Sequence, residues 1–303
     1  MRWEDFRRSD NIEDRRDDDG TSGTPGGGSG GFGGAGQLGL GTIVVLGLIG
    51  WAFGIDPRAL IGGAEMVQNA RHTSQYSQAQ PTQPQGHTGT PSDQIGQFVA
   101  ATLAETEDVW SDILPKQKGI KYIPPHLVLF RGQTRSGCGG ATAAMGPFYC
   151  PVDKKVYLDT SFFADMKRRF GGGGDFAYAY VIAHEIGHHV QDQLGILGKV
   201  QAAQRSAFGS RANAISVRIE LMADCFAGVW AANAQAKYHV IEPGDIEKAV
   251  ATAQAIGDDR VQQATRGTVV PDSFTHGSSA QRVQWFKTGL KSGLVNSCNT
   301  FAQ

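Results

Sequence analysis

The sequence predicts an α+β fold that is mostly helical, with a small sheet beside one central helix. Two runs, residues 180–194 and 215–230, place apolar side chains at helical spacing. Three short apolar runs, at residues 127–130, 148–150 and 155–158, are bounded by turn-forming residues and are typical of strands. Because the glycine-rich and polar stretches fall in the first third, we expect one folded domain over residues 93–303.

The first 92 residues divide into three segments by composition. Residues 1–37 are predicted to be a disordered tail, because the first nineteen carry five arginines among eight acidic residues and the rest is glycine-rich. Residues 38–55 contain no charge and are long enough for a single transmembrane helix; a cleaved signal peptide and a buried core helix are the alternatives. Residues 56–92 are expected to be a flexible linker.

Charges near the apolar segment predict its orientation. Five arginines precede residues 38–55, and only Arg58 and Arg71 follow soon after. The expected protein is therefore anchored once in the inner membrane, with its N-terminus in the cytoplasm and its large domain in the periplasm. The formal net charge of -1 gives no basic face for nucleic acid, which we exclude as a partner.

Four cysteines lie in the expected domain, and none forms a C-x-x-C pair. A zinc site made of cysteines is therefore not expected, whereas an oxidising compartment favours disulfides. Four thiols allow three pairings. The preferred one joins Cys138 to Cys150, across a glycine-rich loop, and Cys225 to Cys298.

Capping residues and prolines suggest where the elements of the domain begin and end. A first helix is expected behind Ser92 or Asp93, ending before Pro115. The three strands follow; one is expected to pair with an extended substrate, and the alternative is that they only cover the central helix. After a short helix at residues 162–170, Asp175 is the predicted N-cap of the central helix, which runs to about Gln193.

The central helix carries a His-Glu-x-x-His box. His184 and His188 are four residues apart, so both imidazoles project from one face of the helix and can share a metal ion. Glu185 lies about one hundred degrees around the helix from His184 and stays near that ion as a general base. The box therefore predicts a Zn²⁺ site.

A third ligand is expected from the second long helix. Glu220 and Asp224 are one turn apart in an otherwise apolar run, and a buried pair of carboxylates needs a cation to offset its desolvation. We expect Glu220 to bind the metal and Asp224 to orient a ligand histidine. His189 points about one hundred degrees away from His188 and is left outside the site.

Several segments resemble one family of bacterial proteins. VIAHEIGHHVQDQLG, RIELMADCFAGVW, AIGDDRVQ and SFTHGSSAQRVQWF are similar to the neutral zinc metallopeptidase family, whose members have a short N-terminal membrane segment. The resemblance covers about residues 94–301 and implies a zincin-like metallopeptidase domain. More distantly, the chain is similar to gluzincin peptidases, in which an E-x-x-A-D run, here Glu220 to Asp224, supplies the third ligand.

A partial motif match extends this resemblance to His276 and Arg282. CAAX prenyl proteases and heat-shock membrane endopeptidases have an H-P-x-x-x-x-R stretch, but Gly277 and Ser278 stand in place of the expected prolines. The resemblance implies that His276 donates a hydrogen bond to the oxyanion, and the alternative is a cap of the next helix. Arg282 is expected to hold a carboxylate in place.

The sequence as a whole predicts a zinc-dependent endopeptidase acting on a protein or peptide substrate. In this mechanism Glu185 takes a proton from a metal-activated water and passes it to the leaving amine. A non-catalytic scaffold stabilised by zinc is the alternative from another functional class. A third possibility is self-processing, in which the linker reaches the active site.

Overall fold

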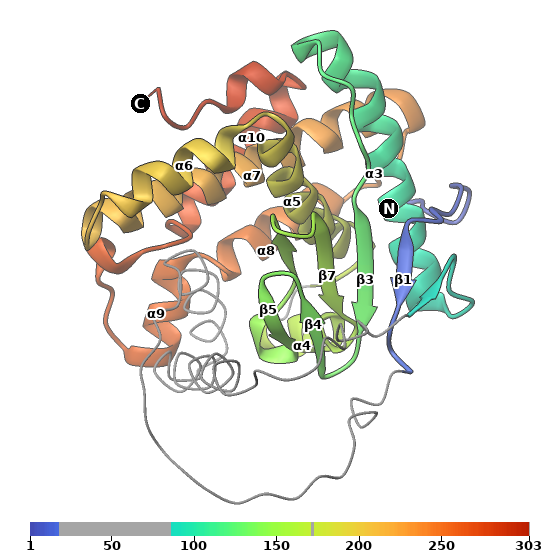
Figure 1. Ribbon diagram of the computed structural model, residues 1–303, viewed down its shortest axis with the longest axis horizontal. Coiled ribbons are helices and arrows are strands. Elements are labelled where there is room, and N and C mark those ends of the chain that lie inside the picture. The colour runs from blue at the N-terminus through green and yellow to red at the C-terminus, as the bar shows by residue number, and fades with distance from the viewer. Residues whose placement is uncertain (18–85, 171–172, 303) are drawn as a thin grey trace, which may run out of the picture.

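The computed structural model describes residues 1–17, 86–170 and 173–302 and has an α+β fold (Figure 1). The strands are β1 (Ile12–Asp14), β2 (His87–Thr88), β3 (His126–Phe130), β4 (Gln133–Ser136), β5 (Gly139–Thr142), β6 (Phe148–Cys150) and β7 (Lys155–Asp159). Five of them form a mixed sheet in the order β2-β1-β3-β7-β6, and β4 pairs with β5 in a hairpin. The three predicted strands are therefore confirmed as β3, β6 and β7.

Strand directions set the edges of this sheet. β1, β3 and β7 run parallel, whereas β2 and β6 each run antiparallel to the strand beside them. Within the described part of the chain, β2 and β6 are the edge strands. Of the three predicted strands, β3 and β7 therefore have neighbours on both sides, and β6 has an unpaired side among the described residues.

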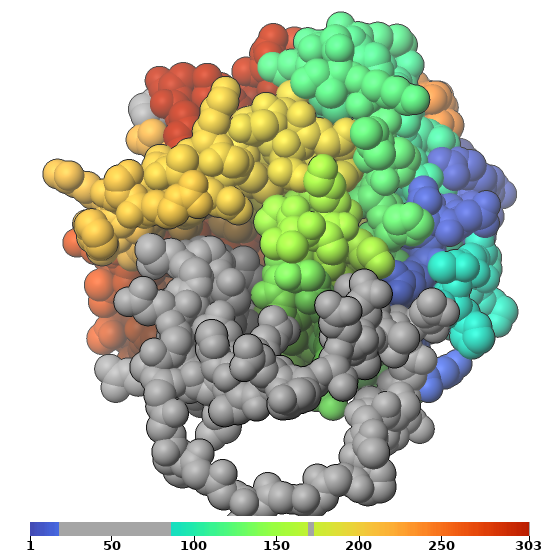
Figure 2. Space-filling model, in the orientation of Figure 1, coloured from blue at the N-terminus to red at the C-terminus, as the bar shows by residue number. Residues whose placement is uncertain are grey.

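The N-terminal residues belong to the fold, so the prediction of a disordered tail is wrong for residues 1–17. β1 lies inside the sheet, and the side chain of Ile12 is fully buried. The charged residues find partners on the next helix: Arg7 contacts Asp108 at 2.8 Å, and the Ser9 hydroxyl donates to Glu107 at 2.6 Å. In Figure 2 these residues, in blue, lie against the cyan and green residues that follow position 86.

The pairing of β1 with β2 constrains the topology around residues 18–85. Glu13 pairs with Thr88 and Asp14 with His87, so the two ends of that segment lie side by side. The predicted membrane helix at 38–55 lies outside the described residues, and no described helix is long and apolar enough to cross a membrane. One crossing would leave two paired strands on opposite sides of a bilayer. The predicted arrangement, with the N-terminus in the cytoplasm and the domain in the periplasm, is incompatible with this sheet.

Eight helices pack around and behind the sheet in the described part of the chain. They are α3 (Gln94–Lys118), α4 (Ser161–Phe170), α5 (Asp175–Gln193), α6 (Ile196–Arg205), α7 (Ser210–Tyr238), α8 (Asp245–Ala255), α9 (Asp258–Arg266) and α10 (Ser279–Ser292). The central helix α5 contacts α3, α7, α8 and β6. Its Phe176 stacks on Trp230 of α7, and Trp110 of α3 meets Phe226 of α7 edge to face, so the core lies between these three helices.

Two helix boundaries differ from the prediction. α3 continues through Pro115, which removes a single helical hydrogen bond, and ends where Gly119 adopts a left-handed conformation and donates to the Pro115 carbonyl. The domain also begins earlier than residue 93, because β2 precedes that position. Asp175 is the first residue of α5 and Gly174 its N-cap.

Helices α7 and α10 approach each other through glycine. A Cβ atom at Gly289 would lie 1.9 Å from the carbonyl oxygen of Cys225, and one at Gly228 would lie 2.1 Å from that of Phe286. Only glycine fits such an approach. The disulfide Cys225–Cys298 ties α7 to the 3-10 turn Val295–Cys298, and Cys138–Cys150 ties the β4–β5 hairpin to β6, so the preferred pairing is confirmed.

Candidate metal centre

The two histidines of the box project from α5 toward α7. Their spacing of four residues brings the rings of His184 and His188 together, with centroids 4.9 Å apart and planes nearly perpendicular. Between them lies Gly187, where a Cβ atom would approach the carbonyl oxygen of Ala223 to 3.0 Å. The missing side chain therefore lets α5 and α7 come close enough for the imidazoles to reach the second helix.

Glu220 of α7 faces both rings. Its Oε2 lies 3.2 Å from Nε2 of His184, and its Oε1 lies 3.5 Å from Nε2 of His188. One ligand atom from each of the three residues lies within 4.8 Å of the others. The side chains are only 8% to 13% exposed, so the cluster is largely removed from solvent.

These separations fit a zinc ion. Zn²⁺ bonds of about 2.0–2.1 Å at tetrahedral angles place ligand atoms roughly 3.3–3.4 Å apart. The two distances from Glu220 to the histidine nitrogens, 3.2 and 3.5 Å, lie on either side of that value. Two imidazoles and one carboxylate are also a donor set that leaves a fourth tetrahedral position open. The three residues could therefore hold a zinc ion.

Asp224 orients the first histidine and is itself held by Arg282. Its Oδ1 lies 2.9 Å from Nδ1 of His184, and Arg282 donates to both carboxylate oxygens, at 2.8 and 2.9 Å. Tyr180 adds a hydroxyl donor at 2.5 Å. Burial would raise the pKa of Asp224, but Arg282 and His184 outweigh it and lower the pKa to about 2. The buried carboxylate is therefore fully ionised and has several donors.

Neighbouring charges also shift the pKa values of the proposed metal ligands His184 and Glu220. Burial alone would lower the pKa of His184, but the Asp224 carboxylate and Glu220 raise it to about 10. Burial would raise the pKa of Glu220, but His188, His184 and His276 hold it well below its usual range. The cluster is thus an anionic pocket that favours positive charge.

Glu185 lies beside the cluster without joining the three ligands. The residue is buried, and the backbone of Tyr149 on β6 lies near enough to its carboxylate to act on its pKa. Burial raises its pKa, against the nearby charges of His184 and His188. A buried carboxylate with a raised pKa is a stronger base than an exposed one, which suits proton transfer.

His276 is positioned by a residue that sequence reasoning missed. Nδ1 of His276 lies 3.1 Å from Asp258 Oδ1, and Asp258 Oδ2 accepts the backbone N–H groups of Thr275, His276 and Gly277. These bonds fix the loop before α10, where Ser278, and not His276, is the N-cap. The ring is close enough to contribute to the lowered pKa of Glu220.

His189 lies outside the cluster, as the helical geometry predicts. Its Nε2 lies 2.7 Å from the carbonyl oxygen of Ile123, and its Nδ1 lies 3.1 Å from the hydroxyl of Tyr149. Burial lowers its pKa. The ring therefore holds the loop before β3 against α5 and is not directed at the metal ligands.

Tyr180 and Asp258 are two site residues that the sequence patterns did not single out. Tyr180 is four residues before His184 and so lies on the ligand face of α5, a spacing that could have identified it. Asp258 is 18 positions from His276, and only the folded chain brings the two together.

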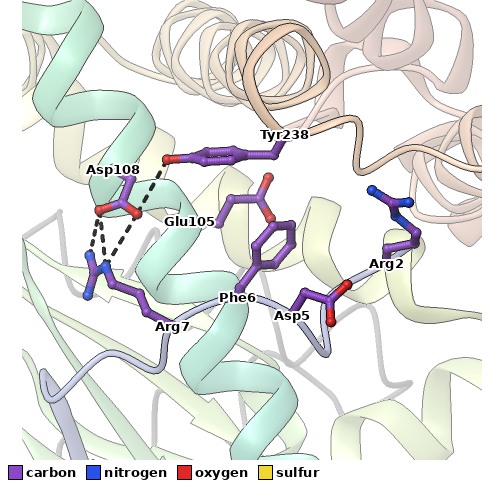
Figure 3. Close-up of a pocket in the computed structure, with 7 residues that line it drawn as sticks. All are labelled: Arg2, Asp5, Phe6, Arg7, Glu105, Asp108 and Tyr238. Carbon is purple, nitrogen blue, oxygen red and sulfur yellow. Dashed lines mark hydrogen bonds and ion pairs between the residues drawn. The ribbon is translucent and has the colours of Figure 1, made fainter.

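A separate pocket of about 330 Å³ lies under the N-terminal residues (Figure 3). Its lining residues come from the N-terminal segment, α3 and the end of α7: Arg2, Asp5, Phe6, Arg7, Glu105, Asp108 and Tyr238. None of the predicted site residues lines it. The candidate metal centre is therefore a different place in the molecule.

Comparison with known proteins gives one family match and several similar sequences. Residues 1–301 match the family model described as "Putative neutral zinc metallopeptidase". The chain is 47% identical over 303 residues to the Uncharacterized protein YpfJ of Escherichia coli K12, covering 100% of this chain and 99% of that one. It is also 47% identical over 214 residues to the Uncharacterized protein Rv2575 of Mycobacterium tuberculosis, covering 67% of this chain and 70% of that one. No solved structure matches.

Proposed function

This chain belongs to the neutral zinc metallopeptidase family, and we propose that it is a zinc-dependent endopeptidase with a zincin-like active site. One observation carries the proposal: His184, His188 and Glu220 converge with zinc-like spacing, while Glu185 lies beside them on the same helix. A structural zinc site would normally be closed by four protein ligands, and Glu185 would have no role in it.

In the proposed reaction, His184, His188 and Glu220 would hold Zn²⁺, which would act as a Lewis acid toward the substrate carbonyl and a water molecule. Glu185 accepts a proton from the attacking water and delivers it to the amine that leaves. Asp224 keeps the proton of His184 on Nδ1, so that Nε2 faces the centre. Arg282 keeps Asp224 ionised and fixed in place.

We propose that an extended peptide binds along the free edge of β6. Among the described residues this strand pairs with β7 on one side only, and α5 lies next to it. The backbone of Tyr149 lies near enough to the Glu185 carboxylate to act on its pKa, so β6 lies beside the proposed base. A peptide that adds as a further strand would therefore bring its carbonyl groups to the metal centre.

We propose His276 as the donor to the oxyanion. Asp258 accepts the proton at Nδ1 if the ring is neutral, and no described residue bonds Nε2, which leaves that nitrogen available to the substrate. Replacing His276 by Gln is expected to lower kcat by roughly 100-fold, as for other oxyanion donors, without changing the zinc content. An unchanged kcat would show that His276 does not stabilise the oxyanion and only holds the loop through its contact with Asp258.

The Glu185→Gln variant tests the proposed reaction. We expect it to bind zinc as the wild type does and to cleave casein no longer, because glutamine cannot accept the proton. The wild type should lose activity in a chelator and regain it with Zn²⁺. If the zinc-loaded wild type cleaves nothing, the protein is a zinc-stabilised scaffold; if Glu185→Gln still cleaves, another residue is the base.

We propose an extracytoplasmic location for the described domain. Both disulfides join segments of the domain and leave no free cysteine in the described chain. Disulfides persist in oxidising compartments. The membrane remains a proposed partner, with residues 1–17 and 86–302 on one side of it. Extraction of membranes with carbonate, compared between the whole chain and one lacking residues 38–55, tests that partner.

A further inference from the structure

Gln191 touches a proposed ligand from inside the protein. It lies in α5, three residues after His188, and its side chain is fully buried. Its Oε1 is 3.0 Å from Nδ1 of His188, and its Nε2 donates to the carbonyl oxygen of Ile219 at 2.8 Å. Ile219 directly precedes Glu220, so one amide connects both helices that supply ligands.

The chemistry of these two contacts fixes which way the amide points. A carbonyl oxygen only accepts hydrogen bonds, so the NH₂ group of Gln191 must face Ile219. The amide oxygen must then face His188, where it can only accept. Nδ1 of His188 therefore carries a proton, and in the neutral ring the lone pair lies on Nε2, the atom that faces Glu220 Oε1.

We infer that Gln191 is a positioning residue of the metal centre: it sets the tautomer and ring orientation of His188 and ties that ligand to the backbone beside Glu220. The inference rests on the proposed function, because it assigns a role toward the metal. The two contacts also explain why residue 191 is a neutral amide and not a carboxylate like Asp224, which faces His184. A carboxylate at position 191 would place a second buried negative charge against the Ile219 carbonyl oxygen, to which the amide donates a hydrogen bond.

A comparison of two α5 glutamines tests the inference. Gln191→Met keeps the length of the side chain and removes both hydrogen bonds. Gln193→Met is the matched control, because Gln193 bonds Ile123 and His189 and touches none of the three ligands. Zinc affinity would be measured by competition with a chelator, and the Co²⁺-substituted proteins would be compared by their visible absorption spectra.

We expect Gln191→Met to bind zinc about 10- to 100-fold more weakly, as for other residues that orient metal ligands, and to have an altered cobalt spectrum. Gln193→Met should match the wild type in both. Wild-type affinity and spectrum in Gln191→Met would overturn the inference. The apparent Tm of each metal-free protein separates a weakened site from a weakened fold.

Gln191→Glu keeps an acceptor for His188 and serves as a second variant if Gln191→Met does not fold. It should keep most of the wild-type zinc affinity, because a carboxylate also holds a ligand histidine in this tautomer, while the carboxylate that faces the Ile219 carbonyl oxygen should lower the apparent Tm. A loss of zinc affinity of about 10-fold or more, relative to the wild type, would overturn the inference. A wild type that binds zinc and cleaves no peptide would refute the peptidase proposal and leave the role of Gln191 standing.

Discussion

Replacing Glu105 by Gln should stabilise the protein increasingly as the pH rises. Glu105 lies on α3 under the N-terminal segment, next to Tyr238 and Phe6 (Figure 3). The residue is 2% exposed, and neither carboxyl oxygen has a hydrogen-bond partner among the described residues. Burial, with a smaller contribution from Asp108, raises the pKa of Glu105 from 4.5 to about 8.

The sign of the effect follows from proton binding. Between the two pKa values, the unfolded chain has released the proton that the folded chain still binds, so the free energy of unfolding falls as the pH rises. The loss is about 1.4 kcal/mol for each pH unit in that window. From about pH 5 to about pH 7.5 the wild type should lose about 3 kcal/mol that Glu105→Gln, which does not titrate, retains.

Urea unfolding of both proteins at these two pH values measures the difference. A chelator keeps both in the metal-free state, so the site histidines contribute equally and cancel. Glu247→Gln, at an exposed position of α8, controls for removing one acidic group. A difference between wild type and Glu105→Gln that is the same at both pH values would refute the reasoning, because Glu105 would then ionise alike in the folded and unfolded chains.

Three further perturbations probe the site and the topology. Arg282→Met leaves the buried Asp224 carboxylate without its cation and should cost about 3–5 kcal/mol in the free energy of unfolding, measured in urea; a cost below about 1 kcal/mol would contradict the pairing. Gly187→Ala adds a Cβ that α7 must make room for, so zinc affinity should fall several-fold while the circular dichroism spectrum stays unchanged; wild-type affinity would show that the helices separate without disturbing the ligands. Single cysteines at exposed Asp10 and Lys291 should react with an impermeant maleimide from the same side of a cell membrane, and labelling from opposite sides would contradict the pairing of β1 with β2.

Local spacing predicted the parts of the site that lie on single helices. The interval between His184 and His188 fixes a shared face whatever the surrounding fold, and Glu220 and Asp224 form a second such pair. The approach of the two helices could be anticipated only in part. It depends on Gly187 meeting the backbone of Ala223, a contact between residues 36 positions apart.

Residues 1–17 show why composition alone wrongly predicted disorder for the start of the chain. Charged residues indicate disorder when they have only solvent as a partner, but here Arg7, Ser9 and Asn11 bond Glu107 and Asp108 about one hundred positions later. β1 has only three residues and gains its stability from β3 and β2, so no local period reveals it. The β4–β5 hairpin was missed for a similar reason, because its strands are mostly polar or glycine.

The charges around the centre favour a bound cation. Glu185, Glu220 and Asp224 are three buried or nearly buried carboxylates, and among the described residues Arg282 is the permanent cation that bonds one of them, Asp224. Two negative charges remain, which a divalent ion would balance. Without an ion the compensation must come from protons, and the pKa values of His184 and His188 are raised accordingly. Zinc bound as proposed would therefore compete with protons for the same anionic pocket, and its affinity should fall as the pH falls.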